Sequence, residues 1–227
     1  MNSLFAARDI YKVYKNNGKE VRAVDGISVQ FQKGRSVAIL GPSGAGKSTL
    51  LHILGGLDKP TSGNVLIDDM DIYKLPDKGR ASIRNSRVGF VFQFYHLLPD
   101  FTALENVMMP AMIHGLDARL LGEDVRDRAA GALRLVGLED RMAHKPSELS
   151  GGECQRAAIA RAIINKPEIL LCDEPTGNLD SKNSELVYDL LLDLKAKIGL
   201  TLIIVTHDER FSQRTDDIIR LKDGRVV

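Results

Sequence analysis

The chain has 227 residues, of which 44% are hydrophobic, and a formal net charge of +1. This length suits one large domain, or a domain with an inserted lobe, and the near-neutral charge with scattered Lys and Arg argues against a nucleic-acid partner. Two cysteines without a zinc pattern favour a reduced, cytoplasmic protein, and no apolar run reaches the roughly 20 residues needed to span a bilayer.

The first part of the chain predicts strands around one helix. Strands are expected where apolar residues alternate or run together, at Ser3–Val13, Ala23–Phe31, Ser36–Leu40, Gly63–Ile67 and Arg87–Phe92. A helix is expected at Lys47–Gly55, directly after the third strand.

From Pro99 onward, helical spacing dominates and then alternates with strands. Helices are expected at Thr102–Ile113, Asp124–Val136, Arg156–Asn165, Ser184–Ile198 and Phe211–Thr215. Strands are expected at Ile169–Asp173 and Leu200–Thr206, and Asp223-Gly224 predicts a hairpin turn between Ile218–Leu221 and Arg225–Val227. The order predicts a mixed α/β core interrupted by a helical insertion of roughly 60 residues.

A glycine-rich segment between the third strand and the first helix predicts a phosphate-binding loop. Its residues are Gly41, Pro42, Ser43, Gly44, Ala45, Gly46, Lys47, Ser48 and Thr49, which fit G-x-x-x-x-G-K-[ST]. Glycines let backbone N–H groups turn inward around phosphate oxygens, and the helix N-terminus adds its positive dipole end. Lys47 would reach the β- and γ-phosphates, and the Ser48 hydroxyl would hold Mg²⁺.

Three other strand ends carry polar residues suited to phosphate chemistry. Asp173 ends an apolar strand and can share Mg²⁺ with the loop, while Glu174 can orient or deprotonate a water. Gln93 ends the strand before the insertion, and its amide can touch both Mg²⁺ and the attacking water, although a glutamine there can also be a plain surface residue. His207 follows a strand and can contact the γ-phosphate, and it can hold the water together with Glu174. The remaining histidines have no such setting.

A second anion site is predicted at Ser150, Gly151 and Gly152, which open a helix. Ser150 and Glu153 also fit a capping box, and both interpretations can hold together. Since one ATP needs only one phosphate-binding helix start, the chain is expected to work as a pair. Cys154 lies at this helix start, where a thiol pKa can be lowered, whereas Cys172 reads as an inert buried residue.

The nucleotide base has two candidate contacts. Tyr14 precedes the loop and could stack on adenine, with Tyr11 as the competing choice and plain packing as the alternative for either. The run from Asn165 to Glu168 is similar to a guanine-reading motif, but its fourth residue is Glu and it lies at a helix end. It therefore reads as a turn, and ATP is expected rather than GTP.

Five motifs in this order resemble the ATP-binding cassette family across essentially the whole chain. They are GPSGAGKST at 41–49, Gln93, LSGGECQR at 149–156, ILLCDEPTGNLD at 169–180 and VTHD at 205–208. The resemblance implies an α/β P-loop NTPase (RecA-like) core with an antiparallel β subdomain and an inserted α-helical subdomain. It implies one domain over 1–227, with a nucleotide-binding core at 1–93 and 162–227 and a helical subdomain at about 94–161.

The same resemblance implies ATP and Mg²⁺ as cofactors and a head-to-tail dimer of two copies. Each ATP would lie between the phosphate loop of one copy and the Ser150–Gly152 turn of the other. Asp180 is thereby assigned to the dimer seam and Tyr14 to adenine stacking.

The segment from Phe94 to Val107 is similar to ATPase subunits of bacterial lipoprotein-releasing complexes. ATPases of macrolide and peptide exporters, and a cell-division ATPase that signals to a wall hydrolase without transport, are the alternatives. The resemblance implies an ATPase peripheral to the cytoplasmic face of the inner membrane, bound to integral membrane permease subunits and without direct cargo contact. A groove near Phe94 to Phe101 is expected to receive a short helix of the membrane partner.

Overall fold

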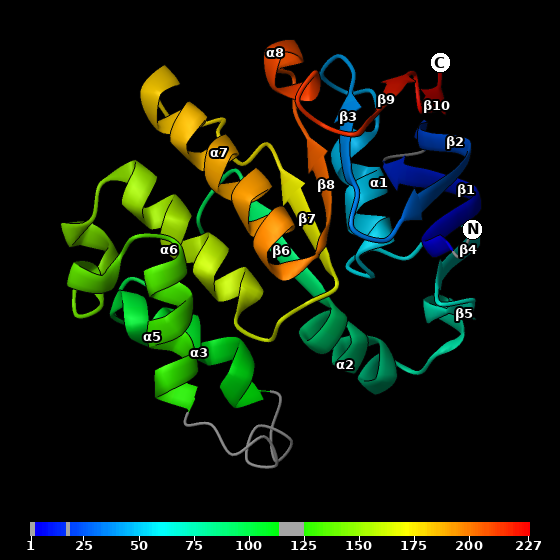
Figure 1. Cartoon of the computed structure of the whole chain (residues 1–227). Helices are drawn as coiled ribbons and strands as arrows, with labels where there is room; N and C mark the ends of the chain where they lie inside the picture. The colour runs from blue at the N-terminus through cyan, green and yellow to red at the C-terminus, as the bar shows by residue number, and fades with distance from the viewer. Residues whose placement is uncertain (1–2, 17–18, 114–124) are drawn as a thin grey trace.

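An antiparallel sheet carries the N-terminal part of the chain. The structure, a computed structural model, describes residues 3–16, 19–113 and 125–227 (Figure 1). The strand order is β2-β1-β4-β5. Its strands are β1 (Ser3–Asn16), β2 (Lys19–Gln32), β4 (Ser62–Ile67) and β5 (Met70–Asp71).

A second, mostly parallel sheet forms the centre of the molecule, with strand order β10-β9-β3-β8-β7-β6. Its strands are β3 (Ser36–Leu40), β6 (Val88–Phe92), β7 (Ile169–Asp173), β8 (Thr201–Val205), β9 (Asp217–Lys222) and β10 (Arg225–Val226). Strands β9, β3, β8, β7 and β6 are parallel, so their carboxyl ends meet at one edge of the sheet. The segments that follow β3, β6, β7 and β8 therefore gather at that edge.

Helices cover both faces of the central sheet. They are α1 (Lys47–Leu54), α2 (Asp77–Arg87), α3 (Ala103–Ile113), α5 (Val125–Leu135), α6 (Gly151–Ile163), α7 (Ser181–Ile198) and α8 (Glu209–Ser212). Figure 1 shows α3, α5 and α6 grouped beyond β6, on the side away from β1 and β2. Among the described residues, no helix has the length and apolarity to span a membrane.

The central strands are buried on both faces, which explains their continuous apolar sequence. Along β7, Ile169 and Leu171 pack with α1 and the antiparallel sheet, whereas Leu170 and Cys172 pack with α6 and α7. The two hydrophobic clusters therefore lie on opposite faces of one sheet, with α1 on one face and α6 on the other.

The predicted mixed α/β architecture with an antiparallel sheet and inserted helices is confirmed. Helix α6 begins at Gly151 behind the Ser150 cap, as the capping box predicted. Helix α7 begins at Ser181, three residues earlier than expected, because the Asp180 side chain caps it. The hairpin turn is confirmed, with Asp223 and Gly224 both at positive φ.

Other element boundaries differ from the expectations. Helix α2 was not predicted. Ile83 is its single buried residue, so its sequence has no periodic apolar stripe that would indicate a helix. Helix α8 begins at Glu209 rather than Phe211, because the Asp208 carboxylate caps its first turn. Asp124, the expected first residue of α5, lies outside the described residues.

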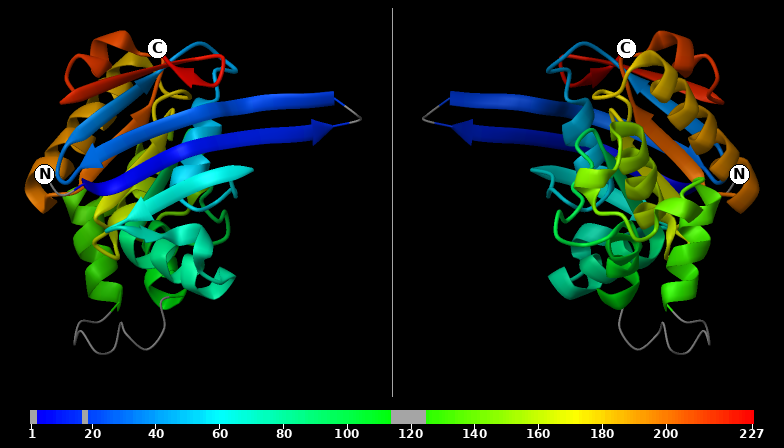
Figure 2. Two further views of the ribbon diagram at one scale, coloured as in Figure 1. Left: turned by 90° about the vertical axis from the view of Figure 1, so that its right-hand side faces the viewer. Right: turned by 90° about the vertical axis from the view of Figure 1, so that its left-hand side faces the viewer.

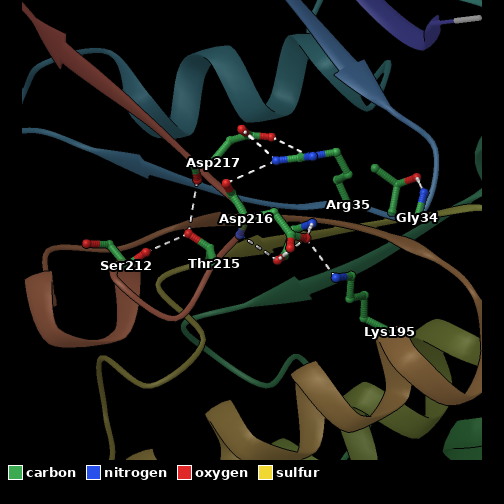
Figure 3. A network of polar contacts seen from close by, with 9 residues as sticks. Gly34, Arg35, Lys195, Ser212, Thr215, Asp216 and Asp217 are labelled. Atoms are coloured by element: carbon green, nitrogen blue, oxygen red, sulfur yellow. Dashed lines mark hydrogen bonds and ion pairs between the residues drawn. The ribbon is translucent and has the colours of Figure 1, made fainter. Parts of the chain in front are cut away.

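A polar network links the starts of β3 and β9, at the amino edge of the central sheet, to α7 (Figure 3). The Asp216 carboxylate accepts hydrogen bonds from the backbone N–H of Ser36 at 2.7 Å, from the Ser36 hydroxyl at 2.8 Å and from Lys195 Nζ at 2.7 Å. Arg35 binds the Asp217 carboxylate through Nε at 2.8 Å and Nη2 at 2.9 Å. The network holds the starts of β3 and β9 against the C-terminal end of α7.

Strands β1 and β2 form a ribbon that extends outward from the rest of the molecule (Figure 2). The third strand, β4, pairs with β1 only as far as Tyr11, so the ribbon beyond that point has two strands. At the other end of the chain, the turn between β9 and β10 reaches the loop after β3, where Gly224 N donates to Ala45 O at 3.2 Å.

Candidate functional site

The predicted phosphate loop wraps the start of α1 at the carboxyl edge of β3. Gly44 and Gly46 have φ values of 80° and 94°, which only glycine adopts without strain. A Cβ at Gly46 would lie 2.0 Å from Ala23 O, so no larger residue fits there. Because Gly46 caps α1 without a side chain, the first N–H groups of the helix remain available to an anion.

Lys47 lies folded across this loop and is nearly buried. Its Nζ donates to Gly41 O at 2.9 Å and to Pro42 O at 3.0 Å, and the residue is 8% exposed. The loop and the start of α1 thus gather all nine predicted phosphate-binding residues, Gly41, Pro42, Ser43, Gly44, Ala45, Gly46, Lys47, Ser48 and Thr49. A nearly buried ammonium beside the start of a helix is a setting that favours phosphate.

Ser48 and Asp173, two of the three predicted metal ligands, face each other. The Ser48 hydroxyl donates to Asp173 Oδ1 at 2.8 Å, and His52 Nε2 lies 3.5 Å from Asp173 Oδ2. Within the described residues no group of three or more His, Cys, Asp or Glu side chains is arranged to hold a metal ion. One hydroxyl and one carboxylate beside a phosphate loop nevertheless fit Mg²⁺, which usually takes one or two protein ligands together with phosphate oxygens and waters.

Glu174 and His207 meet at the ends of the neighbouring strands β7 and β8. His207 Nδ1 lies 2.7 Å from Glu174 Oε2, with the histidine side chain 75% exposed and the glutamate side chain 20% exposed. Glu174 has a φ of 46°, a left-handed conformation that costs roughly 1–2 kcal/mol in a residue with a Cβ. Such strain persists where surrounding contacts hold the backbone, and it is common at functional sites.

Gln93 lies at the end of β6 and faces the turn after Glu174. Its Nε2 donates to Asn178 Oδ1 at 3.2 Å, and Asn178 Nδ2 donates back to Gln93 O at 3.0 Å. A Cβ at Gly177 would lie 2.8 Å from Gln93 Nε2, so a larger residue there would displace this amide. No hydrogen bond in the described part of the chain joins Gln93 to Ser48 or Asp173.

The Ser150 turn is a complete capping box at the start of α6. Ser150 Oγ accepts from Glu153 N at 3.3 Å, and both Ser150 N and Ser150 Oγ donate to Glu153 Oε2 at 2.8 Å. The N–H of Ser150, together with Arg141 at 2.9 Å, lowers the pKa of Glu153 to about 2. Gly151 and Gly152 follow in the first turn, so the three predicted residues lie together.

The Ser150 turn and the phosphate loop begin helices that belong to different hydrophobic clusters. Helix α6 packs on one face of the central sheet and α1 packs on the other. The two helix starts that the sequence predicts to bind anions therefore belong to helices on different faces of the sheet.

Asp180 lies beside the Ser150 turn through Asn183. Asp180 Oδ1 accepts from Asn183 N at 2.8 Å, which caps α7 and, with the Asn183 side chain, lowers the pKa of Asp180. A Cβ at Gly152 would lie 2.8 Å from Asn183 Oδ1. The glycine turn and the start of α7 thus lie close together.

Tyr14 lies on the two-stranded part of the ribbon and reaches toward the segment that follows α1. Its hydroxyl donates to Asp58 Oδ2 at 2.7 Å, and Lys12 Nζ lies 4.8 Å from the ring centroid. Tyr11 instead packs against Gly26, where a Cβ would lie 2.9 Å from the Tyr11 hydroxyl. The structure thus separates the two candidates: Tyr14 approaches the end of α1, and Tyr11 supports the ribbon.

Several site residues were missed from the sequence. His52 lies one helical turn after Ser48, and the i, i+4 spacing on α1 was the available signal. Asn178 and Asn183 were not predicted, since a lone asparagine carries no pattern. A lowered thiol pKa at Cys154 was one interpretation of the sequence, but burial raises the pKa of both Cys154 and Cys172.

A groove of about 420 Å³ opens beside this site, between α2, β6, α3 and α6. Its walls include Phe90, Phe92, Met109, Pro110 and Arg161. Ile113, at the rim, is 76% exposed. The segment from Phe94 to Phe101 adjoins the groove after β6 rather than lining it.

Comparisons with known proteins match this chain over nearly its full length. A sequence profile for the family described as ABC transporter matches residues 24–177. The lipoprotein-releasing system ATP-binding protein LolD of Geobacter metallireducens is 50% identical and covers 100% of this chain and 99% of its own length. LolD of Legionella pneumophila is 48% identical and covers 98% of this chain and 96% of its own length.

A solved structure is similar in both sequence and fold. The ATP-binding cassette MJ0796, in a dimeric post-hydrolysis state bound to ADP and Pi, is 44% identical with a TM-score of 0.89. The match covers 98% of this chain and 96% of the MJ0796 chain.

Proposed function

This chain belongs to the ABC transporter family, as its motifs predicted, and we propose that it is the ATP-hydrolysing subunit of a lipoprotein-releasing membrane complex. The lipoprotein assignment rests on relatives that are about half identical over nearly the whole chain and carry that name. The main support for the mechanism is the position of the Ser150 turn: it begins α6, which packs on the opposite face of the central sheet from α1 and the phosphate loop.

In this proposal the phosphate loop binds the ATP phosphates. The glycine N–H groups and the start of α1 hold the phosphate oxygens, and Lys47 exchanges its bonds with the Gly41 and Pro42 carbonyls for bonds to the β- and γ-phosphates. Tyr14 stacks on the adenine with Asp58 fixing its hydroxyl. Ser48, Asp173 and Gln93 would hold Mg²⁺, which supplies charge neutralisation of the phosphate oxygens.

Glu174 and His207 then act on the attacking water. Glu174 accepts the proton or orients the water, and His207 holds the Glu174 carboxylate through the 2.7 Å contact and meets the γ-phosphate. Gln93 can turn toward the water and Mg²⁺ when its hydrogen bond to Asn178 breaks. Because both side chains are neutral amides, breaking that bond leaves no charge unpaired.

Two copies complete each site head to tail. The Ser150, Gly151 and Gly152 turn of one copy contacts the γ-phosphate held by the other, and Asp180 lies at the same seam. The MJ0796 cassette, 44% identical, has been solved as a dimer, and this similarity supports the arrangement. We divide the domain into a nucleotide-binding core at 1–93 and 162–227 and a helical subdomain at about 94–161.

The groove between α2, β6, α3 and α6 would receive a short helix of the membrane permease subunits. Its apolar walls, with the exposed Met112 and Ile113 beside it, suit an amphipathic helix. This contact would hold the chain at the cytoplasmic face of the inner membrane, with cargo contacts left to the permease.

Replacing Glu174 by Gln tests the mechanism. The substitution removes the carboxylate that orients or deprotonates the attacking water and leaves the phosphate loop unchanged. ATP binding is therefore expected to persist while ATP turnover falls roughly 100-fold or more. Size-exclusion chromatography with ATP is expected to show a trapped dimer. Normal turnover in this variant would overturn the role of Glu174.

Identification of the co-purifying membrane subunit tests the lipoprotein assignment. Affinity purification of the tagged chain from native membranes is expected to bring down a permease whose depletion leaves lipoproteins in the inner membrane. Recovery of a macrolide or peptide exporter, or of a partner that controls a wall hydrolase, would replace this assignment with one of those functions.

A further inference from the structure

Gln155 is a fully buried amide on α6 that reaches the backbone beside two of the three proposed catalytic residues, Gln93 and Glu174. Its exposed fraction is 0%. Its Nε2 donates to Phe92 O at 3.2 Å and to Pro175 O at 2.6 Å. Phe92 directly precedes Gln93, and Pro175 directly follows Glu174, so one side chain holds the backbone next to each of them.

The orientation of this amide is determined by its two partners. Both are carbonyl oxygens, which accept hydrogen bonds only, so the NH₂ group must face them. The Oε1 atom is then left buried without a partner among the described residues. An unpaired buried acceptor costs free energy, and an apolar side chain of the same length would avoid that cost.

Arg161, also on α6, binds the segment that follows β6. Its guanidinium donates to Tyr95 O at 2.8 Å and to His96 O at 2.5 Å. Helix α6 therefore holds the chain on both sides of Gln93, at Phe92 through Gln155 and at Tyr95–His96 through Arg161.

The Pro175 contact lies next to a strained residue. Glu174 is in the left-handed region with a φ of 46°, and its carbonyl is bonded by Gly177 N at 3.0 Å. A residue in that region needs neighbouring contacts to hold it. The 2.6 Å bond from Gln155 supplies one from outside the turn.

We propose that Gln155 is a positioning residue that couples the Ser150 turn to the catalytic geometry of its own copy. The Ser150 turn begins α6, and Gln155 lies one turn later on the same helix. Nucleotide held by the second copy pulls on the start of α6, and Gln155 carries that displacement to Phe92–Gln93 and Glu174–Pro175. This inference rests on the proposed head-to-tail dimer, because the pull comes from the other copy's ATP.

Replacing Gln155 by Met tests the proposal, since methionine has similar length and removes both hydrogen bonds together with the unpaired oxygen. Tm is expected to fall by a few degrees, because the Phe92 and Pro175 carbonyls lose this donor while the unpaired Oε1 is removed. ATP affinity of the single chain is expected to stay within about twofold, because the phosphate loop is untouched. Turnover is expected to fall roughly 10- to 100-fold through misplacement of the reacting groups. The Hill coefficient for ATP is expected to fall from near 2 toward 1.

Ile159→Val is the matched control. Ile159 is equally buried on α6 but belongs to its hydrophobic face. This variant is expected to lose a little stability and keep turnover and the Hill coefficient. A merely structural role for Gln155 would make both variants lose turnover in proportion to their loss of stability, and that result would overturn the proposal.

Hydrogen exchange of the nucleotide-free chain separates this inference from the proposed function. The Gly177 amide and the amides of Gln93 to Leu98 are expected to exchange faster in Gln155→Met than in the original chain or in Ile159→Val. Unchanged exchange and an unchanged Hill coefficient would each refute the positioning role. If the original chain hydrolysed no ATP, the proposed function would fail, and exchange would still decide whether Gln155 holds these segments.

Discussion

Asp216 offers the sharpest test of what holds the central sheet to α7. Replacing it by Ala removes the acceptor for three donors, the Ser36 N–H, the Ser36 hydroxyl and the Lys195 ammonium. Replacing it by Asn keeps an acceptor for the Ser36 N–H and removes only the charge. The pair of variants therefore separates the hydrogen bond from the ion pair.

The expected losses of stability in the Asn and Ala variants follow from the contacts of Asp216. Lys195 and the Ser36 N–H lower the pKa of Asp216 from 3.8 to about 2, which corresponds to roughly 2.4 kcal/mol at about 1.36 kcal/mol per pKa unit. The side chain is 37% exposed, so solvent screening reduces this contribution to about 1 kcal/mol. The Ala variant also leaves the buried Ser36 N–H unpaired, which brings its loss to roughly 2–3 kcal/mol.

Thermal and urea unfolding followed by circular dichroism measure these losses. At roughly 2–4 °C per kcal/mol for a chain of this size, Asp216→Asn is expected to lower Tm by about 2–4 °C and Asp216→Ala by about 4–12 °C. Asp217→Asn is the matched control, because its partner Arg35 and its own side chain are 40% and 50% exposed and such a pair contributes about 0–1 kcal/mol.

The pH dependence has a definite sign. Because the folded-state pKa of Asp216 lies below its unfolded value, the carboxylate stabilises fully above about pH 4, and that contribution is lost as pH falls toward about 2. The stability gap between the original chain and Asp216→Asn is therefore expected to stay constant from pH 5 to 8 and to narrow below pH 4. A gap that widened on acidification, or equal losses for Asp216→Ala and Asp217→Asn, would refute the reasoning.

Two further substitutions test the nucleotide site. Ser150→Ala is expected to keep the ATP affinity of the isolated chain within about twofold, as measured by fluorescent-nucleotide titration. The turnover of the dimer is expected to fall roughly 10- to 100-fold in an ATPase assay. Weaker ATP binding by the isolated chain would contradict a role of Ser150 toward the ATP of the other copy. Gly46→Ala is expected to abolish ATP binding and to lower stability by more than about 2 kcal/mol, because its Cβ meets Ala23 O at 2.0 Å and φ is positive. Gly34→Ala, also at positive φ but with open space around it, is the control and is expected to cost about 1 kcal/mol and to bind ATP normally.

Local patterns predicted the parts of this molecule whose physics is local. The phosphate loop could be located because strand, glycines, lysine and helix start follow one another directly, and the hairpin at Asp223-Gly224 carries its own turn chemistry. The start of α6 at Ser150 was predicted from its capping box, whereas α7 was placed three residues too late, because its apolar periodicity starts after the Asp180 cap.

What sequence patterns could not supply are contacts between distant segments. Gln155 reads as an ordinary polar residue in a helix, and only the fold brings it to Phe92 and Pro175. The same holds for Asn178 beside Gln93 and for Asp216 beside Ser36. The placement of Ser150 on the face opposite α1 likewise depends on the order of strands in the sheet.

The strand order also bears on how the chain folds while the ribosome is making it. Strand β3, which leads into the phosphate loop, pairs with β8 and β9, and Ala45 in the loop is bonded by Gly224. All three partners are translated long after β3, so its five buried residues stay without sheet neighbours for most of synthesis. Contacts of such high sequence separation form slowly and expose apolar strands meanwhile. The strand that leads into the phosphate loop is therefore expected to reach its final place only after β8, β9 and Gly224 have been synthesised.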